Sequence, residues 1–309
     1  MKSIKKPTLA ISIGDLNGIG IEIALKAHQE ILKVCHPIYC INKTMLQQAI
    51  QLLNTSLPKD FTLFEIDGTF TIHAGKVDAK SGRYAYDSFM AAINLCQNHK
   101  ADGIVTMPIH KEAWMEAGLT YKGHTDLLRQ HFNKDAIMML GCSQMFVALY
   151  TEHIPLSKVT SSIKYNKLLN FFRDFHHAIG KHKVAVLGVN PHAGDHGVLG
   201  NEEREIEKAI QSINKELKEE LFVGCIVPDV AFTPTFRKNF HYFIAMYHDQ
   251  GLAPLKALYF DESVNISLNL PIIRTSVDHG TAFDIAYKNK AHTLSYINAV
   301  NAAIQFINT

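Results

Sequence analysis

Residues 11–27 read ISIGDLNGIGIEIALKA, and this stretch predicts a buried strand, a glycine turn and a helix in direct succession. The apolar residues up to Gly14 are typical of a short strand, and a helix is expected from about Gly20 or Ile21. The turn is neither GxGxxG nor a Walker loop, because no GK[ST] follows. It is interpreted as a tight turn that needs glycine freedom, with a phosphate cradle as the weaker alternative.

The same alternation continues along the chain. Further short apolar runs predict strands at 37–42, 62–66, 103–109, 145–150, 183–190, 243–247 and 264–270. Helical patterns are found at 84–99, 111–118, 165–180, 201–221 and 294–307. Strands that alternate with helices indicate βαβ units with a largely parallel sheet, so the predicted fold class is α/β.

A chain of 309 residues is long enough for two such domains. We expect a discontinuous first α/β domain made of residues 1–125 and 256–309, and a second made of residues 126–255. A chain that leaves one α/β/α domain and returns to it would leave a cleft between the two, where ligands usually bind.

The composition excludes several classes of protein. A net charge of +2, with 47% hydrophobic and 19% charged residues, gives no reason to expect binding to nucleic acid or a membrane surface, so small molecules are the expected partners. The five cysteines form no CxxC pair, which indicates a reducing compartment. Asp15 and Asn17 interrupt the apolar stretch near the N-terminus before it could form a signal-peptide core. We therefore expect a cytoplasmic protein.

Polar side chains crowd into residues 245–286, where predicted strands end. These side chains are His248, Asp249, Lys256, Asn265, Arg274, Asp278, His279 and Asp284. Any one of them could be a solvated loop residue. Because ligand sites in α/β proteins gather at strand ends, the group as a whole indicates a site.

Three histidines, His153, His192 and His248, each follow a predicted strand. One histidine in such a place is more often a hydrogen-bonded structural residue. Three at equivalent strand ends could converge, and a three-imidazole site would leave Zn²⁺ or a similar ion open to substrate oxygens.

Two short motifs mark predicted helix starts. GHTD (123–126) places His124 and Thr125 near a helix N-terminus, which favours an anion such as phosphate. An ordinary cap explains Thr125 or Asp126 but not His124. DHGTAFDIA (278–286) offers small residues against which an adenine or ribose could lie, or it is a capped helix start.

Six segments together resemble the 4-hydroxythreonine-4-phosphate dehydrogenase family, of the isocitrate and isopropylmalate dehydrogenase fold group. In chain order they are GDLNGIGIE, GHTD, VNPHAGDHG, PDVAFTPTF, YHDQGLAPLK and VNISLNLPIIRTSVDHGTAFDIA. The first departs from the family's GDPxGIGPE, since Leu16 and Ile21 occupy the proline positions. The chain is also somewhat short for the family, which we interpret as the loss of peripheral elements.

The resemblance implies a set of site residues. The implied ligands of a divalent metal (zinc, magnesium or cobalt) are His153, His192 and His248, the last of them from the second subunit of a homodimer. Substrate contacts are implied for His124, Thr125, Lys256, Asn265 and Arg274. Acidic residues near the metal are Asp229 and Asp249, and candidates for the catalytic base are Lys256, which we prefer, and Asp249. NAD or NADP is expected against Gly280, Thr281 and Asp284.

The implied reaction is oxidation of 4-phosphohydroxy-L-threonine at C3, followed by decarboxylation to 3-amino-2-oxopropyl phosphate, in pyridoxal 5'-phosphate biosynthesis. One alternative is a related dehydrogenase acting on 4-phosphothreonate or a dihydrodiol. The residues also leave open a three-histidine metal hydrolase, which gives DHGTAFDIA no role, and a binding module without turnover.

Overall fold

The computed structural model describes residues 6–308, which form two compact α/β units. The first unit contains the chain up to Lys134 together with Val264–Ile266 and Leu270–Asn308, and the second contains Asp135–Ser263 and Ser267–Asn269. The boundaries expected at 125/126 and 255/256 would cut helices α5 (His124–Phe132) and α11 (His248–Tyr259). The units keep both helices whole, so Lys256 belongs to the second unit together with His248.

The first unit contains the N-terminal elements and the C-terminal helix. Its strands are β1 (Thr8–Ser12), β2 (His36–Cys40), β3 (Thr62–Phe64), β4 (Gly103–Thr106) and β11 (Arg274–Val277), with the first residues of β10 (Val264–Leu268). Its helices are α1 (Gly20–Ile31), α2 (Lys43–Leu53), α3 (Ala79–Gln97), α4 (Lys111–Glu116), α5, the 3-10 turn η3 (Phe283–Ile285) and α12 (Leu294–Ile307).

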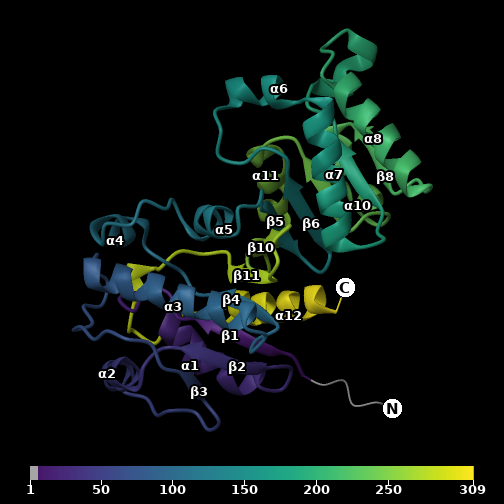
Figure 1. The fold of residues 1–309 in the computed structure, drawn as a ribbon. Coiled ribbons are helices and arrows are strands. Elements are labelled where there is room, and N and C mark those ends of the chain that lie inside the picture. Colours follow the sequence, from purple (N-terminus) through teal and green to yellow (C-terminus); the bar gives the residue numbers. More distant parts are fainter. Residues whose placement is uncertain (1–5, 309) are drawn as a thin grey trace, which may run out of the picture. The chain divides into compact units, whose positions relative to one another are not determined.

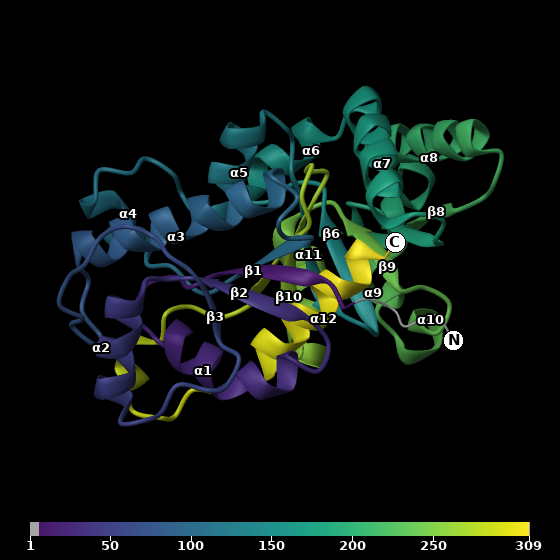
Figure 2. The same cartoon turned by 60° about the horizontal axis from the view of Figure 1, so that its bottom comes forward.

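The sheet of this unit has the strand order β3-β2-β1-β4-β11, followed by β10. The first five of these strands pair in parallel. Helices α3 and α4 pack together against one face, and α1 and α12 pack together against the other (Figures 1 and 2). Parallel strands end at the same edge, so the segments that follow β1, β4 and β11 lie side by side.

Aromatic and aliphatic side chains fill the space between this sheet and α3, α4 and α5. Phe89, Trp114, Leu127 and Leu128 are almost completely buried there. Trp114 and Leu127 flank the 117–123 connection, so their burial fixes the start of α5 on the sheet.

The second unit is built around strands β5 (Ile137–Cys142), β6 (Met145–Leu149), β7 (Val184–Leu187), β8 (Phe222–Ile226) and β9 (Tyr242–Ala245). Its longer helices are α7 (Tyr165–Ile179), α8 (Glu203–Leu217) and α11, and its short ones are α6 (Val159–Ser162), α9 (Pro228–Ala231), α10 (Pro234–Arg237) and the 3-10 turns η1 (Leu156–Lys158) and η2 (Pro191–Gly197).

The strand order in this unit is β5-β6-β9-β7-β8. Strands β5 and β6 form an antiparallel hairpin, whereas β6, β9, β7 and β8 pair in parallel. Helices α7 and α8 pack together, and α11 packs on β6 and β9 (Figure 1). A Cβ on Gly251 would lie 2.4 Å from Val147 Cγ1, which is too close for any other residue. Glycine at this position therefore allows α11 to pack closely against the sheet.

All eight predicted strands are present, and so is the start of α1 at Gly20. Three strands, β5, β8 and β11, were not predicted, and neither were helices α2 and α11. The alternation in 264–270 predicted a half-buried strand, but β10 is buried except at Asn265, because both of its faces are covered.

Candidate functional site

A buried arginine is the centre of the polar group in the first unit. Arg274 starts β11 and is 2% exposed. Its Nη2 donates a hydrogen bond of 2.7 Å to Thr106 Oγ1 at the end of β4, and its Nη1 lies 3.5 Å from Asn265 Oδ1. Burial lowers the pKa of Arg274 to about 9, so the guanidinium remains charged at neutral pH. A buried guanidinium is a site to which an anion can bind.

His124 stands beside this arginine at the first position of α5. Its ring packs edge-on against Phe89 and Trp114, with centroids 4.6 and 5.7 Å away. Burial, and next the positive charge of Arg274, hold the pKa of His124 well below its usual value, so the ring is neutral. Its Nε2 is buried and has no hydrogen-bond partner among residues 6–308.

The structure therefore joins His124, Asn265 and Arg274, which the sequence predicted from separate motifs, into one group. Thr125 follows His124 in the first turn of α5, where free backbone N–H groups favour an anion. The helix start predicted at GHTD is confirmed, since α5 begins at His124.

The glycine turn after β1 packs against the DHGTAFDIA segment. Ile19 N donates to Thr281 O at 3.1 Å, and Tyr287 Oη donates to Leu16 O at 2.8 Å. A Cβ on Gly18 would lie 2.8 Å from Thr281 O. The glycine therefore permits a close approach of two backbones, which supports the tight-turn interpretation of 11–27.

The candidate cofactor residues differ in accessibility. Gly280 is exposed, and a Cβ placed on it would meet nothing within 4 Å. Thr281 is buried and Asp284 is exposed. Nearby, the rings of Phe283 and His110 stack with centroids 4.7 Å apart. The backbone of this segment is thus accessible at Gly280, whereas at the next residue, Thr281, it is held by the hydrogen bond from Ile19.

Asp15 is a buried acidic residue in the glycine turn that follows β1. Its Oδ1 accepts hydrogen bonds from Ser81 Oγ and, at 2.9 Å, from Asn17 N. Burial raises the pKa of Asp15 above its usual value. Ser81 lies in the first turn of α3, so this carboxyl group connects the turn after β1 to α3.

In the second unit, the three candidate metal ligands follow adjacent parallel strands. His153 comes after β6, His248 after β9 and His192 after β7, and these strands are neighbours in the order β6-β9-β7. The rings of His153 and His248 have their centroids 5.6 Å apart.

His192 does not complete a triad with these two rings. Among residues 6–308, no three His, Cys, Asp or Glu side chains are grouped so that they could hold a metal ion. His192 is exposed and opens a left-handed run, with φ between 42° and 79° at residues 192–196. The three-histidine metal site therefore stays a prediction.

The other candidates of this unit lie on helices. Asp249 is exposed, and its Oδ1 lies 2.6 Å from His248 Nδ1, the kind of contact that orients metal-binding histidines. Lys256 lies on the same helix, with Nζ 5.4 Å from the centre of the Phe260 ring. Asp229 is exposed on α9.

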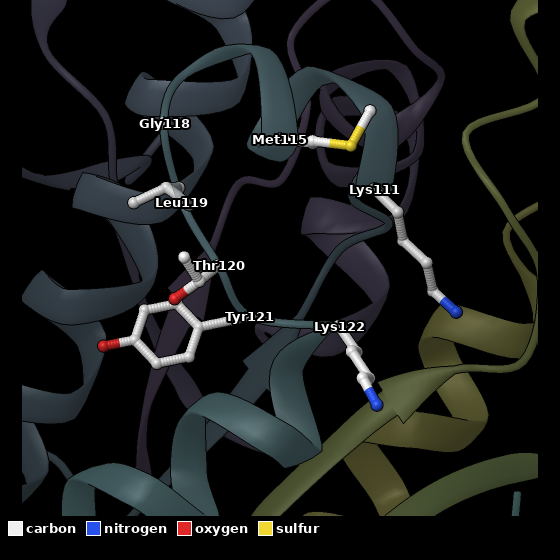
Figure 3. A pocket seen from close by; sticks show the side chains of 7 residues that line it. All are labelled: Lys111, Met115, Gly118, Leu119, Thr120, Tyr121 and Lys122. Atoms are coloured by element: carbon white, nitrogen blue, oxygen red, sulfur yellow. The ribbon is translucent and has the colours of Figure 1, made fainter.

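A separate cavity of about 710 Å³ lies on the first unit, along the connection from α4 to α5 (Figure 3). Lys111, Met115, Leu119, Tyr121 and Lys122 are among its lining residues. None of the predicted site residues lines it, so it is not the candidate site.

Two residues near the candidate site residues were not predicted from the sequence. Thr106 ends the strand GIVT and holds Arg274, and its position as the polar last residue of an apolar strand is the signal that could have identified it. Gln250 lies inside the YHDQG motif, between residues that received roles.

No helix of residues 6–308 is long and apolar enough to cross a membrane. A family model described as pyridoxal phosphate biosynthetic protein PdxA matches residues 33–303. A Sulfurimonas denitrificans protein named 4-hydroxythreonine-4-phosphate dehydrogenase is 67% identical over 301 residues, which cover 97% of this chain and 98% of that protein. A Helicobacter pylori protein of the same name is 46% identical, with coverage of 96% and 98%.

Solved structures agree. The 4-hydroxythreonine-4-phosphate dehydrogenase of Klebsiella pneumoniae matches with a TM-score of 0.84 and 29% identity, covering 100% of each chain. The enzyme of the same name from Burkholderia phymatum matches with a TM-score of 0.83 and 30% identity, covering 97% of this chain and 98% of that one. The family model and these relatives match nearly the whole chain, which therefore belongs to the pyridoxal phosphate biosynthetic protein PdxA family.

Proposed function

We propose that this protein is a 4-hydroxythreonine-4-phosphate dehydrogenase. It oxidises 4-phosphohydroxy-L-threonine at C3 with NAD or NADP, and loss of CO₂ then gives 3-amino-2-oxopropyl phosphate. The observation that carries the proposal is the buried, charged Arg274 beside the neutral His124 in a chain of this family. A phosphorylated amino acid presents both a phosphate and a carboxylate, so an anion-binding group is what the substrate requires.

In this proposal, the first unit binds the anionic part of the substrate. Arg274 supplies charge, and Asn265 and Thr125 supply polar groups beside it. The buried Nε2 of His124 supplies a further hydrogen bond that no described residue uses. A phosphorylated substrate brings an anionic group to this buried cation, and a dihydrodiol carries no phosphate, which favours the phosphorylated substrate.

His153 and His248 would hold a divalent metal, with His192 as the third ligand. Imidazole nitrogens suit zinc better than magnesium, which prefers oxygen ligands, so zinc is the proposed ion and cobalt a substitute for it. A bound metal supplies polarisation of the C3 hydroxyl, and NAD(P)⁺ supplies a hydride acceptor. Asp249 would keep the His248 ring oriented through the 2.6 Å contact with Nδ1.

Lys256 is proposed to take the hydroxyl proton, with Asp249 as the alternative. Both lie on α11 with His248, so one rigid element would carry a metal ligand and the base. The open backbone at Gly280 and the anchored Thr281 are proposed to lie against NAD(P), with the exposed carboxylate of Asp284 available to a ribose hydroxyl.

The test is a substrate panel with the purified protein, followed at the nicotinamide absorbance. The panel contains 4-phosphohydroxythreonine, 4-phosphothreonate and a dihydrodiol, each with NAD or NADP and with Zn²⁺, Co²⁺ or Mg²⁺. We expect the first substrate to give the highest kcat/KM, and His192→Ala to lose metal-dependent reduction. Preference for another substrate would reject the proposed one, and full activity of His192→Ala after chelator treatment would reject the metal site.

We also propose that the protein is a homodimer whose subunits share active sites. If His248 serves the partner's site, mixed dimers of inactive His192→Ala and His248→Ala subunits contain one intact site. Random mixing would then restore about a quarter of the wild-type activity, because half of the dimers are mixed and one of their two sites is intact. No recovery would assign His192 and His248 to the same chain.

A further inference from the structure

Lys111, the first residue of α4, lies against the start of α5. A Cβ on Gly123, the N-cap residue of α5, would be in van der Waals contact with Lys111 Cε, at 3.8 Å. The next residue is His124, which stands beside Arg274 in the candidate site. The side chain of Lys111 therefore reaches from α4 to the N-terminus of α5, and all four residues belong to the first unit.

The ammonium group of Lys111 has no fixed partner in the described chain. The side chain is exposed, and no residue among 6–308 forms an ion pair or a hydrogen bond with its Nζ. Figure 3 shows the side chains of Lys111 and Lys122 extending in the same direction from the cavity wall. Exposure alone is ordinary for a lysine. The contact with Gly123 is what places Lys111 at the candidate site, and no existing ion pair would have to break for it to bind a ligand.

The N-terminus of α5 favours an anion. Gly123 has no side chain with which to cap the helix. The acid of the first turn is engaged elsewhere, because Asp126 Oδ2 accepts from Lys122 N at 3.0 Å and from Gln130 Nε2 at 3.4 Å. His124 Nε2 is buried and has no hydrogen-bond partner among the described residues. Free backbone N–H groups, the helix dipole and this imidazole therefore meet at the helix start that Lys111 contacts.

The negative charge of the proposed substrate exceeds the positive charge of this group. A phosphate monoester carries about −1.5 to −2 at pH 7. Thr125 and Asn265 are uncharged, and the pKa of His124 lies well below its usual value, so this ring is neutral as well. Arg274 supplies one positive charge, and the dipole of α5 supplies roughly half of another. A second cation would complete the neutralisation, and Lys111 is in place to provide it.

We propose that Lys111 binds the phosphate group of the substrate at the N-terminus of α5, as the second cation beside Arg274. The inference rests on the proposed function, since that function supplies the phosphate. Lys256 does not fill this place, because the proposed base must be uncharged to take the hydroxyl proton. Lysine binds phosphate as a point charge, so the charge of Lys111 matters more than the shape of its head group. Its loss should weaken substrate binding more than it slows the chemical step.

The experiment uses the full chain and two measurements. Steady-state kinetics with 4-phosphohydroxythreonine and saturating NAD or NADP gives KM and kcat. Reductive methylation followed by peptide mass spectrometry gives the labelling rate of each lysine, with and without 4-phosphohydroxythreonine or inorganic phosphate. The second measurement detects binding at Lys111 without any turnover.

Four variants separate the charge of Lys111 from other effects. Lys111→Met keeps a stem of similar length and removes the charge, whereas Lys111→Arg keeps the charge. Lys122→Met removes the other lysine of the cavity. Lys43→Met is the matched control, since Lys43 is exposed at the first position of α2 in the same unit. Thermal unfolding verifies that each variant is folded.

We expect Lys111→Met to raise KM about tenfold or more with a smaller change in kcat, because a charge-assisted contact is lost. Lys111→Arg should recover most of this loss. Lys122→Met should have a smaller effect than Lys111→Met, and Lys43→Met should match the wild type. In the wild type, 4-phosphohydroxythreonine and inorganic phosphate should each slow the methylation of Lys111 and leave that of Lys43 unchanged.

Three results would overturn the inference and leave the proposed function standing. They are a wild-type KM in Lys111→Met, an equal rise of KM in Lys111→Met and Lys122→Met, and methylation of Lys111 that the substrate does not slow. A wild-type protein that does not turn over 4-phosphohydroxythreonine would instead reject the proposed function. Methylation with inorganic phosphate would then still decide whether Lys111 binds a phosphate at the start of α5.

Discussion

The guanidinium of Arg274 on β11 is held by the hydroxyl of Thr106 on the neighbouring parallel strand β4, at 2.7 Å. Thr106→Val keeps the shape of the side chain and removes the acceptor. We expect an unfolding free energy lower by about 1 to 3 kcal/mol, because a buried charged donor loses a partner. If Arg274 binds the substrate, KM should also rise by about tenfold with a smaller change in kcat, since about 1.4 kcal/mol of binding corresponds to that factor. Urea denaturation and steady-state kinetics measure both, with the exposed Thr44→Val as the control. Unchanged KM and stability in Thr106→Val would refute the role of this contact.

The low pKa of His124 predicts acid sensitivity. The folded protein keeps this ring neutral because burial, and next the charge of Arg274, disfavour its protonation. The unfolded chain takes up the proton near its ordinary pKa of about 6.5, so stability is fully present above that pH and is lost as the pH falls below it. The loss is at most about 1.4 kcal/mol per pH unit from this one group.

Unfolding free energies measured at pH 7 and pH 5 check this expectation. His124→Asn should lose less stability between the two values than the wild type, because its side chain does not titrate. His241→Asn, at an exposed position, should keep the wild-type difference. An equal loss in the wild type and in His124→Asn would show that other groups cause the acid sensitivity.

Substitution of Gly18, which lies against Thr281, tests how a steric clash in this segment affects both stability and NAD(P) binding. Gly18→Ala would place a Cβ 2.8 Å from Thr281 O and displace the 278–287 segment. We expect a loss of about 1 to 3 kcal/mol in stability from overpacking, together with weaker NAD(P) binding.

Gly280→Ala is the matched comparison, because its Cβ would meet nothing within 4 Å. We expect wild-type stability, with weaker NAD(P) binding if the cofactor approaches this backbone as proposed. Calorimetric titration with NAD and NADP measures the binding. Wild-type affinity in both glycine variants would remove the segment from the cofactor site.

Glu203 is a buried acid whose loss should be costly. It is 4% exposed and accepts hydrogen bonds from two backbone N–H groups and, at 2.9 Å, from Asn190 Nδ2. Glu203→Ala should lower the unfolding free energy by about 1 to 3 kcal/mol, since it leaves partly buried donors without their acceptor. The exposed Glu207→Ala on the same helix should change it by no more than about 0.5 kcal/mol. Similar losses in the two variants would show that helix charge, not the buried contacts, is responsible.

Some of the elements that the sequence did not predict contain polar groups that are satisfied internally, whereas β5 was missed although it is an apolar run, IMMLGC. Strand β11 begins Arg-Thr-Ser and is completely buried, because Thr106 binds Arg274 and Ala299 O accepts from Thr275 Oγ1 at 2.7 Å. No apolar run marks such a strand. Helix α11 contains Gly251 and Pro254, which disfavour helix, and it forms because Gly251 allows close packing on the sheet.

The candidate site likewise has features that could be predicted from the sequence and features that could not. Individual motifs could be located from the sequence, since His124 and Thr125 precede an amphipathic helix and each of the three histidines follows an apolar strand. Contacts between distant segments could not, because Thr106 and Arg274 become neighbours only through the pairing of β4 with β11. Gln250 was not predicted for the same reason. Both of its hydrogen-bond partners are backbone groups, which every kind of residue carries, so the sequence does not reveal them.

The left-handed run at residues 192–196 has a consequence for the order in which the chain assembles. Four of its five residues are not glycine, and each would prefer another backbone conformation in isolation. The backbone just before the run, at residues 188–190, is held by Gln250 and Glu203, which lie on helices α11 and α8 later in the chain. We therefore expect the segment that leads to His192 to become fully anchored only after α8 and α11 have formed. If His192 binds a metal as proposed, we expect this capacity to appear only after both helices have formed.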